Sequence, residues 1–240
     1  MIVFTLGDDR EAPFRLNPFE LLPRESITSH VDMMKASMEA AFAMEAAIPQ
    51  LIEETLYRCY ENFGWDIATG RNTRYPDPFA PGVYPFPQLS DFLQVIPKVV
   101  EEHDFDERLK KDYTGSLTAR LKNLTLGAKG AMLDTPRSID WDSLLDRQVV
   151  FELQEVRSGS EKSLIMGFIL SAFNEAVRER FERRGQRPHS HILLVEEAHR
   201  LLSRYTPGDS ANKKHGVEMF SDMLSEIRKY GECLIIADQI

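Results

Sequence analysis

The sequence has few of the features that mark secreted, membrane or metal-binding proteins. Only two cysteines occur in 240 residues, Cys59 and Cys233, and their wide separation argues against a disulfide framework or a cysteine-based zinc site. No apolar run approaches the roughly 18 residues of a membrane span. The first ten residues, "MIVFTLGDDR", lack the basic segment that begins a signal peptide. These absences predict a protein of the reducing cytoplasm with no membrane span.

The composition bounds size and partners. The chain is 42% hydrophobic, which is enough for one large domain or two small ones with a substantial core. A net charge of −9 excludes a protein that binds nucleic acid over its whole surface, but it leaves room for a local basic patch or a ring channel. The most basic region is "RLKKD" (108–112), followed by Arg120, Lys122 and Lys129. It is either a solvated helix face or a surface that faces DNA or another subunit.

The second half of the chain alternates between apolar runs and amphipathic segments. The apolar runs at 147–154, 191–196 and 233–238 predict strands, as does the run at 1–6. The segments between them predict a helix from Ser160, as cap, to Glu182 and a second helix over 213–230 that stops at Gly231. Such an alternation is typical of a parallel α/β sheet covered by helices on both faces.

The first half is mainly helical. The pattern predicts a helix from Thr28 with Ser29 as a cap, a second helix that begins at Pro49, and two more over 89–103 and 106–125. The proline-rich stretch 64–88 and the glycine-containing "GAKGAML" (127–133) read as loops. We therefore predict an α/β core formed by 1–26 and 127–240, with a mainly helical insertion at 27–126.

Two adjacent carboxylates follow a predicted buried strand in "ILLVEEAHRLL" (192–202). Ligands of open parallel sheets bind beyond the carboxyl ends of the strands. There Glu196 can hold Mg²⁺, directly or through water, and Glu197 can orient or deprotonate a water molecule. Adjacent strand residues point to opposite sides, so the two acids would divide these roles. The alternative, with about even odds on this run alone, is that the acids simply open a helix.

The last predicted strand ends in a polar pair, "ADQ" (237–239). Gln239 can sense a γ-phosphate or position the attacking water, and Arg228 can stabilise phosphoryl-transfer charge in a neighbouring subunit. For Arg228 alone, a favourable cation at a helix C-terminus is the better interpretation. His189 and His191 have a spacing that permits metal binding, but we expect structural or solvent-facing roles because no third ligand lies nearby.

These residues resemble HerA-type ATPases of the HerA/FtsK superfamily, which are hexameric motors that pump DNA. The resemblance is carried by "RLNPFELLP" (15–23), "GSLTARLKNLTLGAKGAML" (115–133), "VVFELQEV" (149–156), "ILLVEEAHRLL" (192–202) and "SEIRKYGECLIIADQI" (225–240). The segments span nearly the whole chain, keep the family's order, and are most similar to the bacterial branch with a long helical insertion.

The resemblance implies a RecA-like P-loop fold, ATP and Mg²⁺ as cofactors, and DNA as a partner. It implies that Glu196 and Glu197 are the Walker B acids, with Glu197 catalytic and Glu196 holding Mg²⁺ through water. It further implies that Gln239 is the sensor, that Arg228 acts in trans, and that His199 links nucleotide state to DNA contacts, although a capping or packing role for His199 is at least as well supported.

The sequence departs from the family in one respect, because no G-x-x-x-x-G-K-[ST] phosphate loop occurs in it. In "GAKGAML" the glycines are too close together, and in "GSEKSL" (159–164) Lys162 follows a glutamate. We therefore predict a truncated RecA-like core that carries the hydrolysis-side acids without the phosphate-binding side, and we expect no tight ATP binding to this chain alone.

Two functions remain open at this point. The first is the core of a ring-forming, ATP-driven DNA translocase or helicase, hexameric in the parent protein. The second is a catalytically inactive fragment or interaction module that binds a nuclease or another effector partner.

Overall fold

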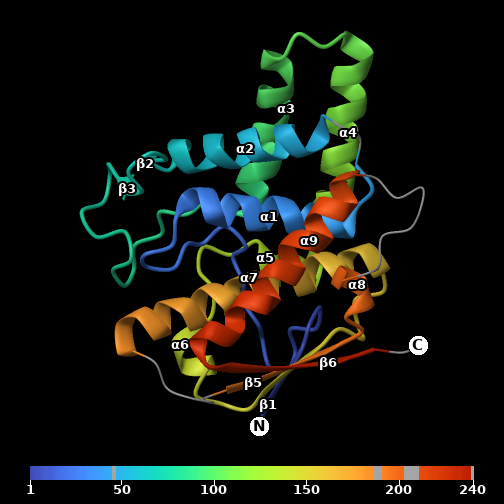
Figure 1. Ribbon diagram of the computed structural model, residues 1–240. Helices are drawn as coiled ribbons and strands as arrows, with labels where there is room; N and C mark the ends of the chain where they lie inside the picture. Colours follow the sequence, from blue (N-terminus) through green and yellow to red (C-terminus); the bar gives the residue numbers. More distant parts are fainter. Residues whose placement is uncertain (45–46, 186–190, 203–210, 239–240) are drawn as a thin grey trace.

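The computed structural model describes residues 1–44, 47–185, 191–202 and 211–238 (Figure 1). Two of the sheets in the described residues are pairs of parallel strands: β1 (Ile2–Thr5) with β4 (Val149–Glu152), and β5 (His191–Glu196) with β6 (Glu232–Ala237). These strands confirm the four that the apolar runs predict. A short antiparallel hairpin, β2 (Trp65–Asp66) with β3 (Arg71–Asn72), lies in the proline-rich stretch that was predicted to be irregular.

The described helices stack above the strands in layers (Figure 1). Helices α1 (Ile27–Ala41), α7 (Gly159–Arg184) and α9 (Ala211–Glu226) lie near the strands, and α2 (Ile48–Asn62), α3 (Leu89–Glu102) and α4 (Glu107–Lys122) lie farther out. The shorter helices are η1 (Asn123–Thr125), α5 (Gly127–Leu133), α6 (Trp141–Leu144), α8 (His199–Leu202) and η2 (Ile227–Tyr230). Within the described part of the chain, no helix combines the length and the apolar character that a membrane crossing needs.

The caps of α1 and α7 lie three and two residues before the serines that were predicted. Ser26 caps α1 by accepting a hydrogen bond from the backbone N–H of Ser29, so Ser29 is inside the helix rather than its cap. Ser158 does the same for α7 through the N–H of Glu161, so Ser160 is not the cap. In both helices the observed cap precedes the first turn, so its hydroxyl can accept a hydrogen bond from the exposed N–H groups there.

The segment 127–133 is helix α5 rather than the predicted loop. Met132 and Leu133 are buried, and a Cβ atom at Gly130 would lie 2.3 Å from the carbonyl oxygen of Thr125. The glycine at 130 therefore serves close packing of the helix against η1, which is a role that glycine content alone does not distinguish from a turn.

One buried apolar cluster joins the predicted core to the predicted insertion. Phe4 and Leu164 belong to the same cluster as Met34, Ile52 and Phe92, which lie on α1, α2 and α3. A second cluster, which includes Leu170, Phe220 and Leu224, joins α7 to α9. The boundary at residues 26 and 127 stays a prediction, since α1 packs directly on the helices of the α/β part.

The contact between α1 and α9 depends on Gly216. A Cβ atom there would lie 2.8 Å from both the carbonyl oxygen of Ala36 and the backbone nitrogen of Ala40. We expect Gly216→Ala to destabilise the fold by about 1–3 kcal/mol, because two helix backbones must separate. Gly115→Ala is the matched control: it lies within α4 with nothing within 4 Å, so it should stabilise by about 0.5–1 kcal/mol. Urea denaturation of both variants tests the pair, and equal effects would contradict it.

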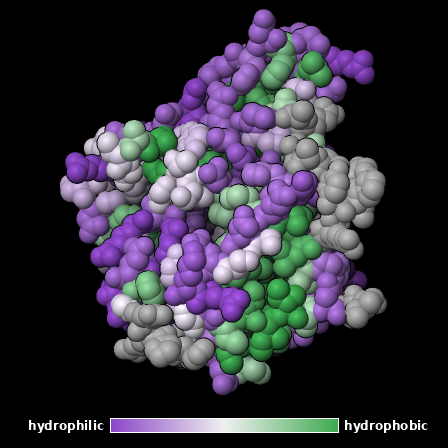
Figure 2. Space-filling view, viewed as in Figure 1, coloured by the Kyte–Doolittle hydropathy of each residue, from purple (hydrophilic) through white to green (hydrophobic). Residues whose placement is uncertain are grey.

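One face of the β5–β6 sheet carries exposed apolar side chains. Ile192, Leu194 and Ile235 are 64%, 54% and 47% exposed, and Cys233 on the same face is also exposed. The helices in Figure 1 lie on the other side of the strands, and Figure 2 shows a hydrophobic patch along β6 that continues toward α8. We had predicted helices on both faces of the sheet. For the β5–β6 sheet this is wrong, because the described helices cover only one of its faces.

Candidate functional site

The parallel pairing of β5 and β6 brings the predicted acids to one edge of the sheet. The register pairs His191 with Glu232 at one end and Glu196 with Ala237 at the other. Glu197 and Asp238 follow these last paired residues directly, so both lie at the carboxyl end of the strands. Side chains from two neighbouring strand ends thus meet where open α/β sheets bind ligands.

Glu197 adopts a left-handed backbone conformation with φ of 52°. Only one other non-glycine residue in the described chain, Arg24, has a positive φ. We had predicted that the alternation of side chains along the strand sets the direction of Glu197. The strand ends at Glu196, so the left-handed turn sets that direction instead. Such conformations cost about 1–3 kcal/mol and persist where the surroundings impose them, often at functional sites.

Arg200 forms an ion pair with the carboxylate of Glu197 through its Nε atom. This pairing lowers the pKa of Glu197, and the charges of Lys162 and His199 lower it further. The guanidinium also lies beside the start of α7, where a Cβ atom at Gly159 would be 3.6 Å from Nη1. Glu197 is thus an ionised, exposed carboxylate held near the first turn of α7.

The lowered pKa of Glu197 can be tested by substitution. We expect Arg200→Gln to raise it toward the ordinary value of a glutamate, because the hydrogen-bonded cation is the largest cause of the shift. Lys162→Gln, which removes a more distant charge, should raise it less. Carboxyl-carbon NMR titration of Glu197 measures both effects, and equal shifts in the two variants would contradict the assignment.

His199 connects the two strand ends. Its backbone N–H donates to Oδ2 of Asp238 over 3.0 Å, and its Nδ1–H donates to Oδ1 of the same carboxylate over 2.6 Å. Sequence reasoning did not find this pairing, nor the pairing of Arg200 with Glu197. The three-residue spacing of Glu197 and Arg200 at the start of a helix is a sequence signal for their ion pair. The contact of His199 with Asp238 depends on the strand register, for which the sequence carries no signal.

The other predicted site residues are placed differently. Glu196 ends β5 with an exposed side chain, and Gln239 lies outside the described residues, directly after Asp238. Arg228 is exposed in η2, before the start of β6. The six-residue strand separates it from Glu197 by about 20 Å within one chain. Any contact of Arg228 with a nucleotide at this edge would therefore involve another subunit.

The described residues include no group of three or more His, Cys, Asp or Glu side chains that could hold a metal ion. His191, which we had considered as a ligand, pairs instead with the buried Glu232 over 2.9 Å across β5 and β6, in line with the structural role that we expected. His189 lies outside the described residues. Glu196, the exposed carboxylate at this edge, is the residue that would hold an Mg²⁺ ion through water.

The two segments considered as phosphate loops are both helical. "GAKGAML" is α5, and "GSEKSL" is the first turns of α7. Lys129 of the first segment binds Glu161 of the second over 2.9 Å, so this lysine already has a carboxylate partner. Neither segment forms a glycine-rich cradle of N–H groups, and these residues do not fit the phosphates of a nucleotide.

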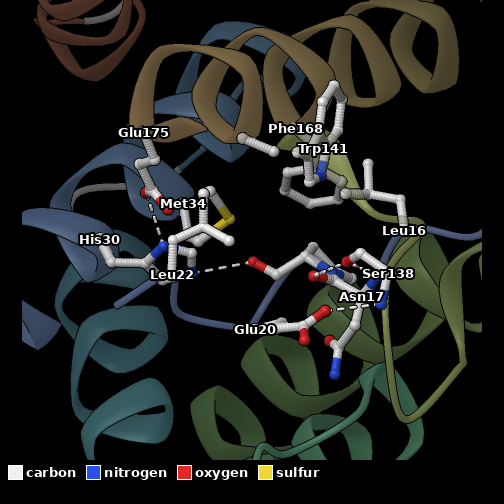
Figure 3. A pocket seen from close by; sticks show the side chains of 12 residues that line it. Leu16, Asn17, Glu20, Leu22, His30, Met34, Ser138, Trp141, Phe168 and Glu175 are labelled. Carbon is white, nitrogen blue, oxygen red and sulfur yellow. Dashed lines mark hydrogen bonds and ion pairs between the residues drawn. The ribbon is translucent and has the colours of Figure 1, made fainter. Parts of the chain in front are cut away.

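An enclosed pocket lies away from the strand ends, among the segment 16–22, α1, α7 and the residues before α6 (Figure 3). His30 and Glu175 meet at its wall, and Glu20 accepts a hydrogen bond from the backbone N–H of Ser138 over 2.5 Å. Burial raises the pKa of Glu20. Hydrogen bonds within the protein occupy these groups, so the pocket is part of the core and is separate from the candidate site.

Comparisons with known proteins place the fold. No protein-family model and no curated protein matches the sequence. The structure is similar to that of VirB4 of Thermoanaerobacter pseudethanolicus, with a TM-score of 0.65 and 17% sequence identity. The match covers 99% of this chain and 57% of the VirB4 chain, so this chain spans little more than half of that protein. The similarity confirms a mixed α/β fold of the VirB4 type, with short parallel sheets and many helices.

Proposed function

We propose that the chain is the hydrolysis-side part of an ATP-driven motor of the HerA/FtsK type that moves double-stranded DNA. The observation that carries the proposal is the exposed, left-handed Glu197 at the carboxyl end of β5, beside the end of β6. The fold shared with VirB4, a P-loop ATPase of the FtsK/HerA-like superfamily, supports an ATPase-type motor fragment at the level of the fold.

In this proposal the two acids at the edge divide the chemistry. Glu197 orients the attacking water and accepts its proton, since it is ionised and exposed. Glu196 holds Mg²⁺ through water, and the ion, when bound, neutralises charge that develops on phosphate oxygens. Gln239, which follows Asp238, senses the γ-phosphate. The phosphates themselves require a loop that these residues do not supply.

A ring explains how Arg228 would contribute. Its position at the opposite end of β6 from Glu197 excludes a role at its own chain's acids, whereas a neighbouring subunit can present it in trans. A hexamer is the assembly that we propose for the parent motor.

The second candidate is a catalytically inactive interaction module that binds a nuclease or another effector. The helical state of both glycine- and lysine-containing segments favours it, because neither segment forms a cradle for phosphates. The exposed apolar face of β5 and β6 also favours it, since such faces commonly mark contact sites.

Expression of the gene with and without the codons upstream of Met1 separates the two candidates. The motor predicts ATP turnover, stimulated by double-stranded DNA, in the longer product and little in residues 1–240 alone. Calorimetric titration with Mg-ATP should likewise detect no tight binding to the 240-residue chain. If the upstream codons encode no G-x-x-x-x-G-K-[ST] run and both products are inactive, the motor proposal is wrong for this gene and the interaction module stands.

A further inference from the structure

The ends of β5 and β6 are joined by a two-point contact. Both oxygens of the Asp238 carboxylate accept hydrogen bonds from one residue, His199, at 3.0 Å from its backbone nitrogen and 2.6 Å from Nδ1. The two residues are 39 positions apart in the sequence, so the contact is tertiary rather than local. Hydrogen bonds to a carboxylate are stronger than those between neutral groups, and two of them fix orientation as well as distance.

This contact lies next to the turn at Glu197, because His199 is two residues after Glu197 in the chain. Glu197 lies between the last residue of β5 and the first residue of α8, and its left-handed conformation redirects the chain from strand to helix. Buried Ala198 and Leu201 hold the far side of the turn in the core. Asp238 holds the exposed side, because it binds the N–H group that the left-handed turn presents at His199.

We propose that Asp238, acting through His199, is the positioning residue for Glu197, so that the end of β6 and the Glu197 carboxylate move as one unit. The importance of this positioning rests on the proposed function, in which Glu197 orients the attacking water and Gln239, directly after Asp238, senses the γ-phosphate. The contact would then couple the segment that carries the sensor to the carboxylate that orients water. A displacement of Asp238, directly after β6, would be transmitted through His199 to Glu197, two residues away from His199 along the chain.

A simpler role for Asp238 is that of a helix cap supplied from a neighbouring strand. A cap needs only the bond to the backbone N–H and acts on α8 alone. The ring contact adds a second constraint, and positioning predicts an effect on the φ angle of Glu197, which precedes the helix. The two roles therefore differ in which residue responds to substitution.

NMR on the 240-residue chain tests the proposal without any nucleotide. In Asp238→Ala, the amide of His199 should exchange at least about tenfold faster. The HN–Hα coupling and Cβ shift of Glu197 should lose their left-handed values. Asp238→Asn retains an acceptor for the N–H group, so it should rescue exchange at His199. Asp222→Ala, at an exposed aspartate of α9, is the control and should change neither.

If Asp238→Ala leaves the HN–Hα coupling of Glu197 unchanged and speeds amide exchange only in α8, Asp238 acts only as a helix cap. That result would overturn the proposal. If Asp238→Ala lowers protection throughout α9 as well, His199→Ala decides, because it removes only the ring contact. Altered Glu197 couplings in that variant support positioning, and unaltered ones overturn it. A failure of Glu197→Gln to affect ATP turnover would count against the proposed function and leave this result intact.

Discussion

Replacement of Glu197 by glutamine is expected to lower ATP turnover by about 10²–10⁴-fold, which is the usual contribution of a positioned general base. The amide keeps the size and much of the hydrogen bonding of the carboxylate but cannot accept a proton from water. Nucleotide binding should stay unchanged, because in the proposed mechanism Glu197 contacts the water rather than the nucleotide. The measurement is steady-state phosphate release by the product expressed with its upstream codons, with calorimetry for binding.

Glu107→Gln provides the matched control for this substitution. Glu107 is an exposed glutamate in the first turn of α4, a helix of the predicted insertion, so its neutralisation should leave turnover unchanged. Undiminished turnover in Glu197→Gln would remove this residue from the mechanism. A similar loss in both variants would indicate a general effect of charge rather than a role for Glu197.

Replacement of His30 by alanine is expected to destabilise the fold by about 3–5 kcal/mol, because it leaves a buried carboxylate without its partner. His30 and Glu175 are 3% and 6% exposed, and their side chains meet at 2.7 Å. The other ring nitrogen donates to the carbonyl oxygen of Pro18 over 2.9 Å. Oxygen atoms face both ring nitrogens and the pKa of His30 is raised, which fits an imidazolium with a proton on each nitrogen.

The pH dependence of stability follows from this ion pair. Burial by itself lowers the pKa of His30, but the charge and hydrogen bond of Glu175 outweigh it, and the pKa is raised. The stabilisation is therefore complete below the unfolded value of about 6.5. It is lost as pH rises through the higher folded value. Urea unfolding between pH 5 and 9 measures this in the wild type.

A double variant gives the control for the His30 experiment. His30→Gln with Glu175→Gln removes both charges while keeping polar groups in place, so it should recover stability relative to His30→Ala and flatten the pH dependence. If His30→Ala costs less than about 1 kcal/mol, or if the wild type gains stability as pH rises from 6 to 9, the buried imidazolium is wrong.

Strands and long helices were predictable because they leave different patterns of apolar residues in the sequence, continuous runs for the buried strands and a recurrence every three or four residues for the helices. The runs 191–196 and 233–238 gave β5 and β6 to within a residue, and Pro49 marked the start of α2. The failures lie where one residue type serves two purposes. Gly130 permits close packing in a helix rather than a turn, and the predicted caps Ser29 and Ser160 lie inside helices that Ser26 and Ser158 cap. Local pattern does not show which backbone will approach a glycine.

The candidate site was predictable in its acids and unpredictable in its geometry. A buried strand followed by Glu196 and Glu197 placed both acids at a sheet edge, and the parallel register supports that placement. That geometry consists of the left-handed turn at Glu197, its ion pair with Arg200, and the hydrogen bonds of His199 to Asp238, which follows β6. Such tertiary constraints leave no periodic trace in the sequence, whereas burial of a strand does.

The exposed apolar face of β5 and β6 also affects the solubility of this chain in salt solutions. Copies of a molecule with a net charge of −9 repel one another, but at 0.15 M salt that repulsion is screened beyond about 8 Å. Ile192, Leu194 and Ile235 then remain free to attract the same face of another copy. Sulfate, which strengthens apolar burial, should salt the chain out at lower concentrations than chloride does, and Ile235→Lys should raise the sulfate concentration that is needed.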